Sequence, residues 1–227
     1  MKVLVIGATG GSGRAAVAEL VRRGHNVTAL SRHGSSLTGP QVRGVDGDAT
    51  DAAVLDALVP CHDAVVVTLG ITEPAMRVRL RGPSGTAPDV RSRGTRTVAA
   101  AMRHHGVRRL VVQTSYGVGG TRARLDLVTR LVFALVLKPQ IADTGVQARE
   151  LHASGLDWVE VQPMYLTDGT TGAPDAPHVS LDGSIRERKV SRRAVAQVLA
   201  DAVERDDYVG KTLSVSGAPA LTSPSRR

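Results

Sequence analysis

A glycine-rich turn near the start of the chain constrains the fold more than any other feature of the sequence. Four apolar residues, Val3 to Ile6, precede the turn, and a helical pattern from Arg14 to Arg23 follows it. A continuous apolar run of this kind is typical of a strand buried on both faces of a parallel sheet. The turn itself, Gly7 to Gly13, has the spacing G-x-x-G-x-x-G. Together, the strand, the turn and the helix predict a dinucleotide-binding unit.

Glycine is required in this turn for reasons of space and backbone freedom. Glycine permits a turn whose main chain passes close to a pyrophosphate. The following helix offers unpaired N–H groups and a partial positive charge at its first turn. A side chain at Gly10 or Gly13 would block that approach or hold the helix away from the strand. We therefore expect the turn, including Gly11, to contact a cofactor.

The end of the next predicted strand, Asn26 to Leu30, indicates which dinucleotide is bound. An acidic residue there would bind the ribose 2′-hydroxyl of NAD and repel the 2′-phosphate of NADP. The chain instead continues with Ser31 and Arg32 and has no acid nearby. Arg32 can bind a phosphate through two N–H groups, Ser31 can donate to it, and Arg14 can approach from the other side. We predict NADP(H), with a solvated loop position as the alternative for Arg32.

Strands and helices alternate along the rest of the chain. Further strands are expected at Gln41–Val45, Ala64–Thr68, Leu110–Gln113, Trp158–Val161 and Thr212–Val215. Helices are expected at Thr50–Val59, Val90–His105, 122–137, 142–153 and Arg192–Glu204, with Lys138-Pro139 separating the third from the fourth. Val179–Leu181 and Ile185–Val190 are predicted to pair as a hairpin around Asp182-Gly183-Ser184.

This alternation predicts an α/β fold, a doubly wound parallel sheet of the Rossmann type. One domain is expected over residues 1–217, with a small C-terminal extension on the substrate side and a disordered tail over 218–227. Substrate-side elements are expected from about 71–96, 116–142 and 164–190.

Composition excludes several classes of protein. The formal net charge of +8 favours acidic partners, but it also fits a coding bias toward arginine. Aromatic residues make up only 2% of the chain, so base stacking and nucleic-acid binding are not expected. The longest apolar stretch, Leu125–Leu137, is interrupted by polar residues and is too short to cross a membrane. With one cysteine, Cys61, and no signal sequence expected, we predict a cytoplasmic protein. No group of residues has metal-ligand spacing.

Several short motifs together resemble the atypical short-chain dehydrogenase/reductases. They are Gly7-Ala8-Thr9-Gly10-x-x-Gly13, Gly47-Asp48, Asp63-Ala64-Val65 leading to Leu69-Gly70, Thr114-Ser115, and Ser154-Gly155-Leu156-Asp157-Trp158 leading to Pro163. The pattern is most similar to the NmrA-like and biliverdin reductase B/flavin reductase-like NAD(P)-binding proteins. This resemblance covers about residues 1–217.

The resemblance implies roles for individual residues. It implies cofactor contacts at Gly7, Thr9, Gly10, Ser12, Gly13, Arg32, Asp48, Ala49, Leu69 and Gly70. It also implies that Ser115 lies beside the nicotinamide, that Pro163 and Met164 lie along its carboxamide side, and that Tyr165 faces the substrate. For Asp48, which can accept from the adenine amino group, the alternative is a bystander beside a helix capped by Thr50 or Asp51.

The chain departs from the family at positions that matter for catalysis. The Tyr-x-x-x-Lys motif of the main branch is absent, because Gly120 stands four residues after Tyr116. Thr144 and Ala148 replace a basic residue and a glutamate of many bacterial relatives. The hydroxyl groups of Ser115, Tyr116 and Tyr165 therefore remain as candidates to orient an acceptor. A cap for Ser115 and packing for the two tyrosines are the alternatives.

The segment 71–89 and the start of the next helix are rich in arginine. The arginines are Arg77, Arg79, Arg81, Arg91, Arg93 and Arg96. They follow Gly70, at the sheet edge where ligands bind in such folds. The segment is either a lid or anion-binding wall for a carboxylated or phosphorylated substrate, or a solvated insertion, which is the simpler interpretation.

The sequence therefore predicts an NADPH-dependent oxidoreductase that reduces a small carbonyl, quinone or conjugated heteroaromatic. A non-catalytic NADP(H) sensor and an epimerase or isomerase on the same fold are the alternatives. The only other partner expected is a small-molecule substrate, and the chain is expected to be a monomer or a homodimer.

Overall fold

A largely parallel sheet forms the centre of the molecule. The computed structural model describes residues 1–70, 85–126, 129, 138–169 and 176–218. Within these residues, nine strands form the sheet: β1 (Lys2–Ile6), β2 (Asn26–Ser31), β3 (Thr38–Gly39), β4 (Val42–Asp46), β5 (Ala64–Val67), β6 (Arg109–Gln113), β7 (Asp157–Pro163), β9 (Pro177–Ser180) and β11 (Lys211–Gly217). Their order is β3-β4-β2-β1-β5-β6-β7-β11-β9. The edge strands β3 and β9 run antiparallel to their neighbours, and the other pairs are parallel.

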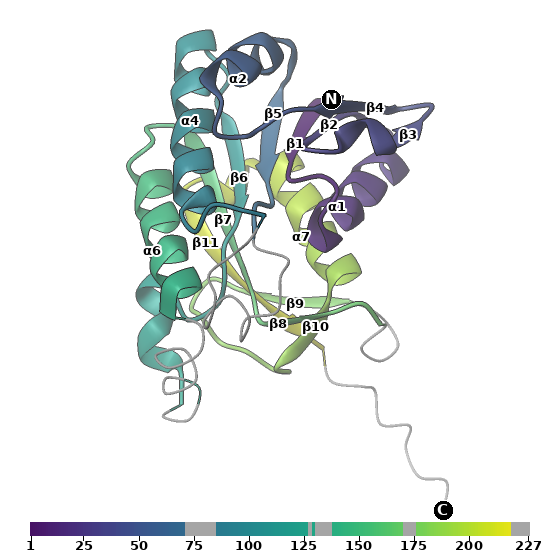
Figure 1. The fold of residues 1–227 in the computed structure, drawn as a ribbon. Helices are drawn as coiled ribbons and strands as arrows, with labels where there is room; N and C mark the ends of the chain where they lie inside the picture. Colours follow the sequence, from purple (N-terminus) through teal and green to yellow (C-terminus); the bar gives the residue numbers. More distant parts are fainter. Residues whose placement is uncertain (71–84, 127–128, 130–137, 170–175, 219–227) are drawn as a thin grey trace, which may run out of the picture.

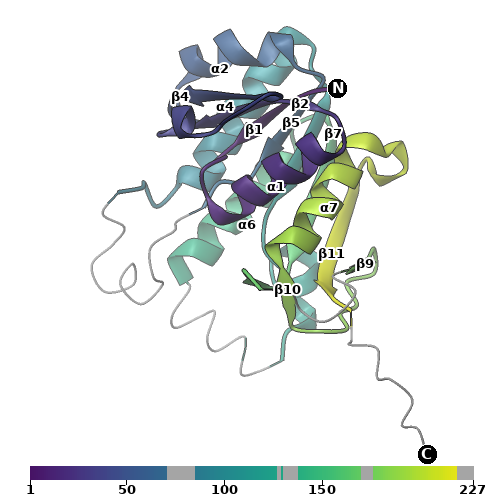
Figure 2. The same cartoon turned by 90° about the vertical axis from the view of Figure 1, so that its right-hand side faces the viewer.

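Helices cover both faces of this sheet (Figures 1 and 2). They are α1 (Gly11–Arg22), α2 (Ala52–Leu58), α4 (Val90–His105), α6 (Lys138–His152) and α7 (Arg192–Glu204). Alternate residues of β1 point to opposite faces: Val3 and Val5 pack with α1 and α7, whereas Leu4 and Ile6 pack with α2, α4 and α6. The predicted doubly wound α/β fold of the Rossmann type is confirmed.

Local capping residues explain where three helices begin or end. The Ser191 hydroxyl accepts from the Ala194 amide, so α7 starts at Arg192. The Asp51 carboxylate caps α2 in the same way. Gly106, with φ of 72°, ends α4 in the left-handed conformation that glycine adopts without strain. The bounds predicted for α4 and α7 are confirmed.

Three predicted helices begin at other residues in the structure. Helix α2 begins at Ala52 rather than Thr50, because Asp51 caps it. Helix α1 begins at Gly11 rather than Arg14, so the last glycine of the turn lies inside the helix. Helix α6 begins at Lys138 rather than 142 and includes Pro139, because proline is tolerated in a first helical turn. Ahead of it, Gly119–Arg124 form a short 3₁₀ helix. Most of the helix predicted over 122–137, the segment 71–84 and the tail from 219 lie outside the described residues.

The predicted hairpin around Asp182-Gly183-Ser184 is wrong. Strand β9 pairs with β11, while β10 (Lys189–Ser191) pairs in parallel with β8 (Tyr165–Thr167), a strand that the sequence did not predict. The turn does form, since the Ser180 hydroxyl accepts from the Ser184 amide at 3.0 Å. The strands on either side pair with other strands, because pairing with more distant chain segments outweighs the local tendency of the turn to form a hairpin.

The parallel strands place chemically useful residues along one edge. The carboxyl ends of β1, β5, β6 and β7 all lie there, followed respectively by Gly7, Thr68, Thr114 and Met164. Ligands of open α/β sheets bind at this edge. Across the part of the chain that the structure describes, no helix is long and apolar enough to cross a membrane.

Candidate cofactor and substrate site

Two neighbouring cavities lie at the carboxyl edge of the sheet. The first, called here the cofactor cavity, is bordered by the glycine turn and by the ends of β2, β4 and β5. Nine of the predicted cofactor contacts line it: Gly7, Thr9, Gly10, Ser31, Arg32, Asp48, Ala49, Leu69 and Gly70. Four others, Gly11, Ser12, Gly13 and Arg14, do not line it. The structure thus collects residues from four separate segments around one space.

The glycine turn leaves no room for side chains at two positions. Gly7 has φ of 80°, and a Cβ atom there would lie 2.9 Å from the carbonyl oxygen of Thr68. A Cβ atom at Gly13 would lie 2.2 Å from the carbonyl oxygen of Gly7, which is impossible without movement of the main chain. Gly10, the residue before α1, makes no side-chain cap. The first N–H groups of α1 can therefore bind an anion at the turn.

The remaining residues of the turn have structural partners. A Cβ atom at Gly11 would lie 2.7 Å from Nε of Arg192, so this glycine leaves space for that side chain. The Ser12 hydroxyl accepts from Nε2 of Gln113 at 3.1 Å. Nε of Arg14 donates to the carbonyl oxygen of Thr9 at 3.0 Å. These contacts fix the turn against β6, α7 and its own main chain.

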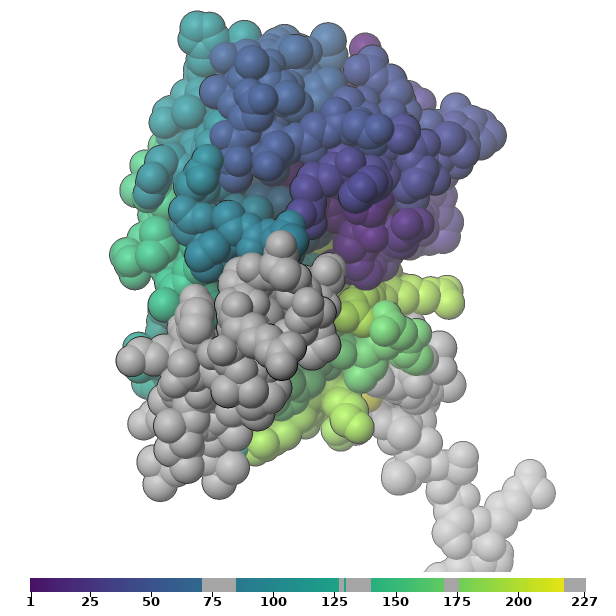
Figure 3. All heavy atoms as spheres, viewed as in Figure 1, coloured from purple at the N-terminus to yellow at the C-terminus, as the bar shows by residue number. Residues whose placement is uncertain are grey.

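Arg32 and Ser31 lie at the ribose end expected for the cofactor. Arg32 donates to the carbonyl oxygen of Gly85 and, at 3.1 Å, to the Thr86 hydroxyl. The Thr9 hydroxyl donates to the Ser31 hydroxyl at 3.0 Å. In the space-filling view, the segment that leads into α4 lies against the residues that follow β2 (Figure 3). The guanidinium group therefore stands at the border of the cofactor cavity.

Asp48 lies in the wall of this cavity without capping α2. Its Oδ1 atom accepts from both the amide and the hydroxyl of Thr50, each at 2.8 Å. These bonds, with that from the Thr50 amide contributing most, hold the pKa of Asp48 below its usual value. Asp51 makes the helix cap instead, at 2.9 Å from the Ala53 amide. Asp48 is thus an ionised acceptor beside the expected adenine position.

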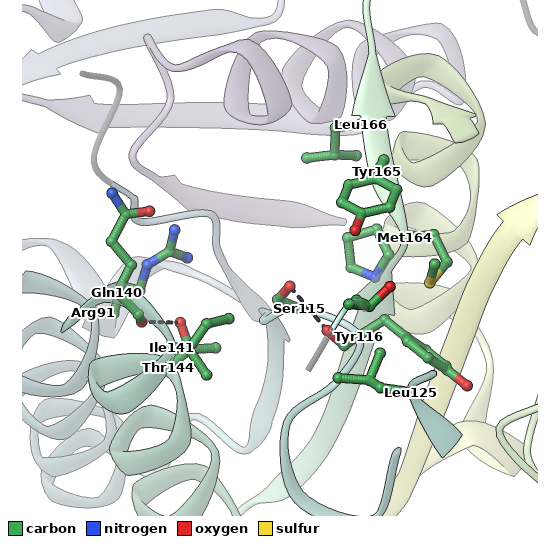
Figure 4. Close-up of a pocket in the computed structure, with 12 residues that line it drawn as sticks. Arg91, Ser115, Tyr116, Leu125, Gln140, Ile141, Thr144, Met164, Tyr165 and Leu166 are labelled. Atoms are coloured by element: carbon green, nitrogen blue, oxygen red, sulfur yellow. Dashed lines mark hydrogen bonds between the residues drawn. The ribbon is translucent and has the colours of Figure 1, made fainter. Parts of the chain in front are cut away.

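The second cavity, called here the substrate cavity, has a volume of about 190 Å³ and mostly apolar walls. All five predicted residues of the reacting end line it (Figure 4): Ser115, Tyr116, Pro163, Met164 and Tyr165. Ser115 follows β6, while Pro163 ends the neighbouring strand β7. The order of the sheet therefore brings these distant residues together.

The two tyrosines have different surroundings. Tyr116 is buried, and its hydroxyl donates to the carbonyl oxygen of Gly183 at 2.8 Å. Burial raises the pKa of Tyr116. Tyr165 is 43% exposed, and in Figure 4 its ring extends over the cavity, apart from Tyr116. The Ser115 hydroxyl makes only a long bond, 3.3 Å, to the carbonyl oxygen of Tyr116. Ser115 and Tyr165 are therefore better placed than Tyr116 to donate to a bound molecule.

The remaining residues of this cavity lie mostly in the segments that the sequence predicted for the substrate side, 71–96, 116–142 and 164–190. They are Leu125, Thr129, Gln140, Ile141, Leu166 and Arg91, together with Thr144, which lies outside those segments. Among them, the sequence analysis gave a binding role only to Arg91, as one arginine of a lid or anion-binding wall. Gln140 and Thr144 are four residues apart on α6, a spacing that places both on one face of the helix. The Thr144 hydroxyl donates to the carbonyl oxygen of Gln140 at 2.8 Å. Ala148 does not line the cavity.

The described residues contain no group of three or more His, Cys, Asp or Glu side chains arranged to hold a metal ion. The groups that the described residues place at the sheet edge include hydroxyl groups, the guanidinium groups of Arg32 and Arg91, the carboxylate of Asp48 and main-chain N–H groups.

Comparisons with known proteins agree with this geometry. The model of a family described as NAD(P)H-binding matches residues 7–206. A curated relative, the 3-diazoavenalumate denitrifying reductase of a Streptomyces species, is 39% identical over 116 residues. That match covers 50% of this chain and 38% of the relative, so the chain corresponds to well under half of that protein.

Solved structures resemble the whole chain. The anaerobillin reductase ChuY of Escherichia coli O157:H7 has a TM-score of 0.77 at 21% identity, covering 98% of this chain and 100% of its own. A short-chain dehydrogenase/reductase of Veillonella parvula, solved in complex with NADP, has a TM-score of 0.77 at 15% identity and covers 99% of both chains. At these identities the likeness establishes the fold. Together with the family match, it confirms the resemblance predicted from the sequence.

Proposed function

Because the chain belongs to the NAD(P)H-binding family, we propose that it is an NADPH-dependent reductase acting on a small organic acceptor. Carbonyls, quinones and conjugated heteroaromatics are the acceptor classes that such a site suits. The observation that carries the proposal is the position of an apolar cavity directly beside the cofactor cavity, with Ser115 in its wall. This arrangement holds an acceptor against a nicotinamide.

The choice of NADPH over NADH rests on the end of β2. Arg32 and Ser31 offer a guanidinium group and a hydroxyl where NAD-dependent proteins of this fold have an acid. A 2′-phosphate can replace the main-chain and hydroxyl acceptors that Arg32 now uses at Gly85 and Thr86. The Veillonella neighbour, solved with NADP, makes the same cofactor a reasonable first candidate.

The residues of the cofactor cavity fit a dinucleotide. The uncapped start of α1 suits the pyrophosphate, and the tight packing at Gly13 brings that helix close to the turn. When bound, the reduced nicotinamide supplies the hydride, and the protein supplies position and polarity.

In the substrate cavity, apolar side chains such as Ile141 and Met164 exclude water from the acceptor. The Ser115 and Tyr165 hydroxyls orient the acceptor and donate hydrogen bonds to the atom on which negative charge develops. The proton comes from the Tyr165 hydroxyl or from solvent, because no lysine follows Tyr116 at the fourth position.

Two named reductases among the similar proteins support this class of reaction. One is called a denitrifying reductase of 3-diazoavenalumate and the other an anaerobillin reductase. Both names describe a reductase, which is the class of enzyme that we propose here.

The test is consumption of NADPH with a panel of quinones, flavins, aldehydes and enones. We expect turnover with at least one class, and about a 100- to 1,000-fold lower kcat for Ser115→Ala, as for the loss of one oriented donor. Binding of NADPH without turnover of any acceptor would contradict the proposal.

A non-catalytic NADP(H) sensor is the second candidate. The observation that favours it is Gly120 at the position where the main short-chain dehydrogenase branch has a lysine. A sensor would bind NADPH and NADP⁺ with different affinities, would turn over no acceptor, and would retain a protein partner only in one cofactor state. A pull-down in each cofactor state, run beside the acceptor panel, separates the two functions.

A further inference from the structure

Arg91, in the first turn of α4, lies where the two cavities meet. Its Nη1 atom donates to the carbonyl oxygen of Leu69 at 2.9 Å, and Leu69 lines the cofactor cavity. The Arg91 side chain itself lines the substrate cavity, on the side opposite Ser115 and Tyr165 (Figure 4). An acceptor held against Ser115 therefore has Arg91 within the same enclosure.

One edge of this guanidinium group lacks a partner. Nε of Arg91 is buried and has no hydrogen-bond acceptor among the described residues. The nearest acidic group, Asp143, accepts instead from the amides of Arg91 and Ser92 and from the Ser92 hydroxyl. Burial lowers the pKa of Arg91, and the charge of Asp143 only partly offsets that effect. A buried donor without an acceptor is unfavourable unless a ligand supplies one.

The rest of the substrate cavity does not compensate this charge. Arg91 is the one side chain with a formal charge among the described residues that line it. Around it are neutral side chains, among them Gln140, Thr144 and Ile141. A neutral acceptor leaves the positive charge unpaired in apolar surroundings, whereas an anionic acceptor pairs it.

We propose that Arg91 is a specificity-determining residue that binds a carboxylate of the acceptor. Since Nη1 is engaged with Leu69 and Nε has no partner among the described residues, the edge formed by Nε and Nη2 is the one left for a ligand. Two parallel N–H donors on one edge match the two oxygens of a carboxylate. The inference rests on the proposed function and narrows its substrate class to small conjugated carboxylates.

The cavity also limits where the reducible group lies. Its volume of about 190 Å³ is below the range of ~300–1,000 Å³ typical of drug-sized ligands, so the part of the acceptor that enters it is small. With its carboxylate at Arg91, its other end lies toward Ser115 and Tyr165 on the opposite wall. The carboxylate is thus a binding group, and the reducible bond belongs to the opposite end.

Binding of matched pairs of non-reacting molecules tests the proposal. Protein loaded with NADP⁺ is titrated in a calorimeter with benzoate and benzamide, crotonate and crotonamide, and cinnamate and cinnamamide. We expect the carboxylate of at least one pair to bind at least tenfold more tightly than its amide. Equal binding, or no binding, of both members in all three pairs would overturn the proposal.

Variants locate the preference at Arg91. Arg91→Met should abolish the carboxylate preference, and Arg91→Lys, which keeps the charge without the paired donors, should retain only part of it. Arg96→Met is the matched control, because Arg96 lies on the same helix, is exposed and pairs with Glu150 at 2.7 Å. A carboxylate preference that survives in Arg91→Met would contradict the assignment. Thermal unfolding of each variant establishes that it is folded, with Arg91→Gln as a second neutral variant.

Cofactor binding and turnover separate this inference from the proposed function. The affinity for NADPH should change less than threefold in Arg91→Met, and a tenfold loss without any effect on carboxylates would assign Arg91 to the cofactor instead. Turnover of neutral acceptors without a carboxylate preference would overturn this inference alone. A carboxylate preference without NADPH turnover of any acceptor would overturn the proposed function alone.

Discussion

The cofactor cavity and the substrate cavity share one sheet edge but are built from different material. Five glycines line the cofactor cavity, namely Gly7, Gly10, Gly47, Gly70 and Gly85. No glycine is present among the described residues that line the substrate cavity, where the walls are side chains of α4, α6 and the ends of β6 and β7. Main-chain atoms in one conformation therefore shape the cofactor cavity. The substrate cavity is shaped by side chains, which can be substituted without a change in the main chain.

This difference has a consequence for substitution. A main-chain wall tolerates no added atoms, so substitution of its glycines should disturb folding and cofactor binding together. A side-chain wall can change without altering the sheet, so changes at the substrate end should alter turnover or selectivity and leave the fold intact. Four tests probe this contrast, in order of decreasing effect.

The largest effect is expected for Gly13→Ala. Its Cβ atom would lie 2.2 Å from the carbonyl oxygen of Gly7, so either α1 or the turn must move. We expect a loss of about 3 kcal/mol in the free energy of unfolding, measured with urea, and loss of measurable NADPH binding. Gly145→Ala in α6 is the matched control, because its Cβ atom would have 3.9 Å to its nearest neighbour. Equal stability of the two variants would contradict the rigid main-chain wall.

The next effect concerns the choice of cofactor. Arg32→Met removes the group expected to bind the 2′-phosphate, at a cost of about 2 kcal/mol for a charged hydrogen-bonding partner. NADPH should then bind about 30-fold more weakly, while the affinity for NADH stays unchanged. Arg43→Met, at an exposed position on β4, controls for the loss of one positive charge. Parallel titrations with NADPH and NADH measure the effect, and equal weakening of both cofactors would contradict the role of Arg32.

The two tyrosines offer a contrast within the substrate cavity. Tyr116→Phe leaves the buried carbonyl oxygen of Gly183 without its donor, so we expect a loss of about 1 kcal/mol in unfolding free energy and little change in kcat. Tyr165→Phe should do the reverse, with lower kcat and unchanged stability, because its side chain is exposed. If Tyr116→Phe lowered kcat more than Tyr165→Phe, then Tyr116, and not Tyr165, would be the residue that orients the acceptor.

The smallest effect concerns pH and the network beneath the substrate cavity. Burial would raise the pKa of Glu160, but hydrogen bonds from His152, Gln162, Thr114 and Thr212 outweigh burial and lower it. Because the pKa is lower in the folded state, this contribution to stability is complete above the unfolded value of about 4.3 and is lost as pH falls below it.

Glu160→Gln should therefore reduce the difference in unfolding free energy between pH 7 and pH 3.5. Urea unfolding at the two pH values measures this difference, with Glu187→Gln at an exposed position as the control. An unchanged difference in Glu160→Gln would show that the network does not hold the carboxylate ionised.

The same contrast explains which parts of the molecule the sequence could predict. The first 32 residues contain the glycine turn, the strand before it and Arg32, which stands where NAD-binding proteins have an acid. Their structure and their contacts depend on local geometry, so the sequence could predict them. The bounds of α4 and α7 were also predictable, because Gly106 and Ser191 act on their own helices.

The substrate end was less accessible to sequence reasoning. Arg91, Gln140 and Tyr165 share a cavity although they come from separate elements, and only packing of α4 against α6 and pairing of β8 with β10 place them together. The hairpin was predicted wrongly for the same reason, because β9 pairs with β11 and β10 pairs with β8 instead of with each other. The family resemblance implied the positions of Ser115 and Pro163, and the parallel pairing of β6 with β7 places both at one sheet edge.

A crystal structure with NADPH tests the central claim most directly, namely that one cofactor lies along the sheet edge and joins the two cavities. The account predicts the 2′-phosphate within hydrogen-bond distance of Arg32, the pyrophosphate at the start of α1, and the nicotinamide against Ser115 and Pro163. A cofactor bound with its nicotinamide away from Ser115, or no bound cofactor at saturating NADPH, would contradict it.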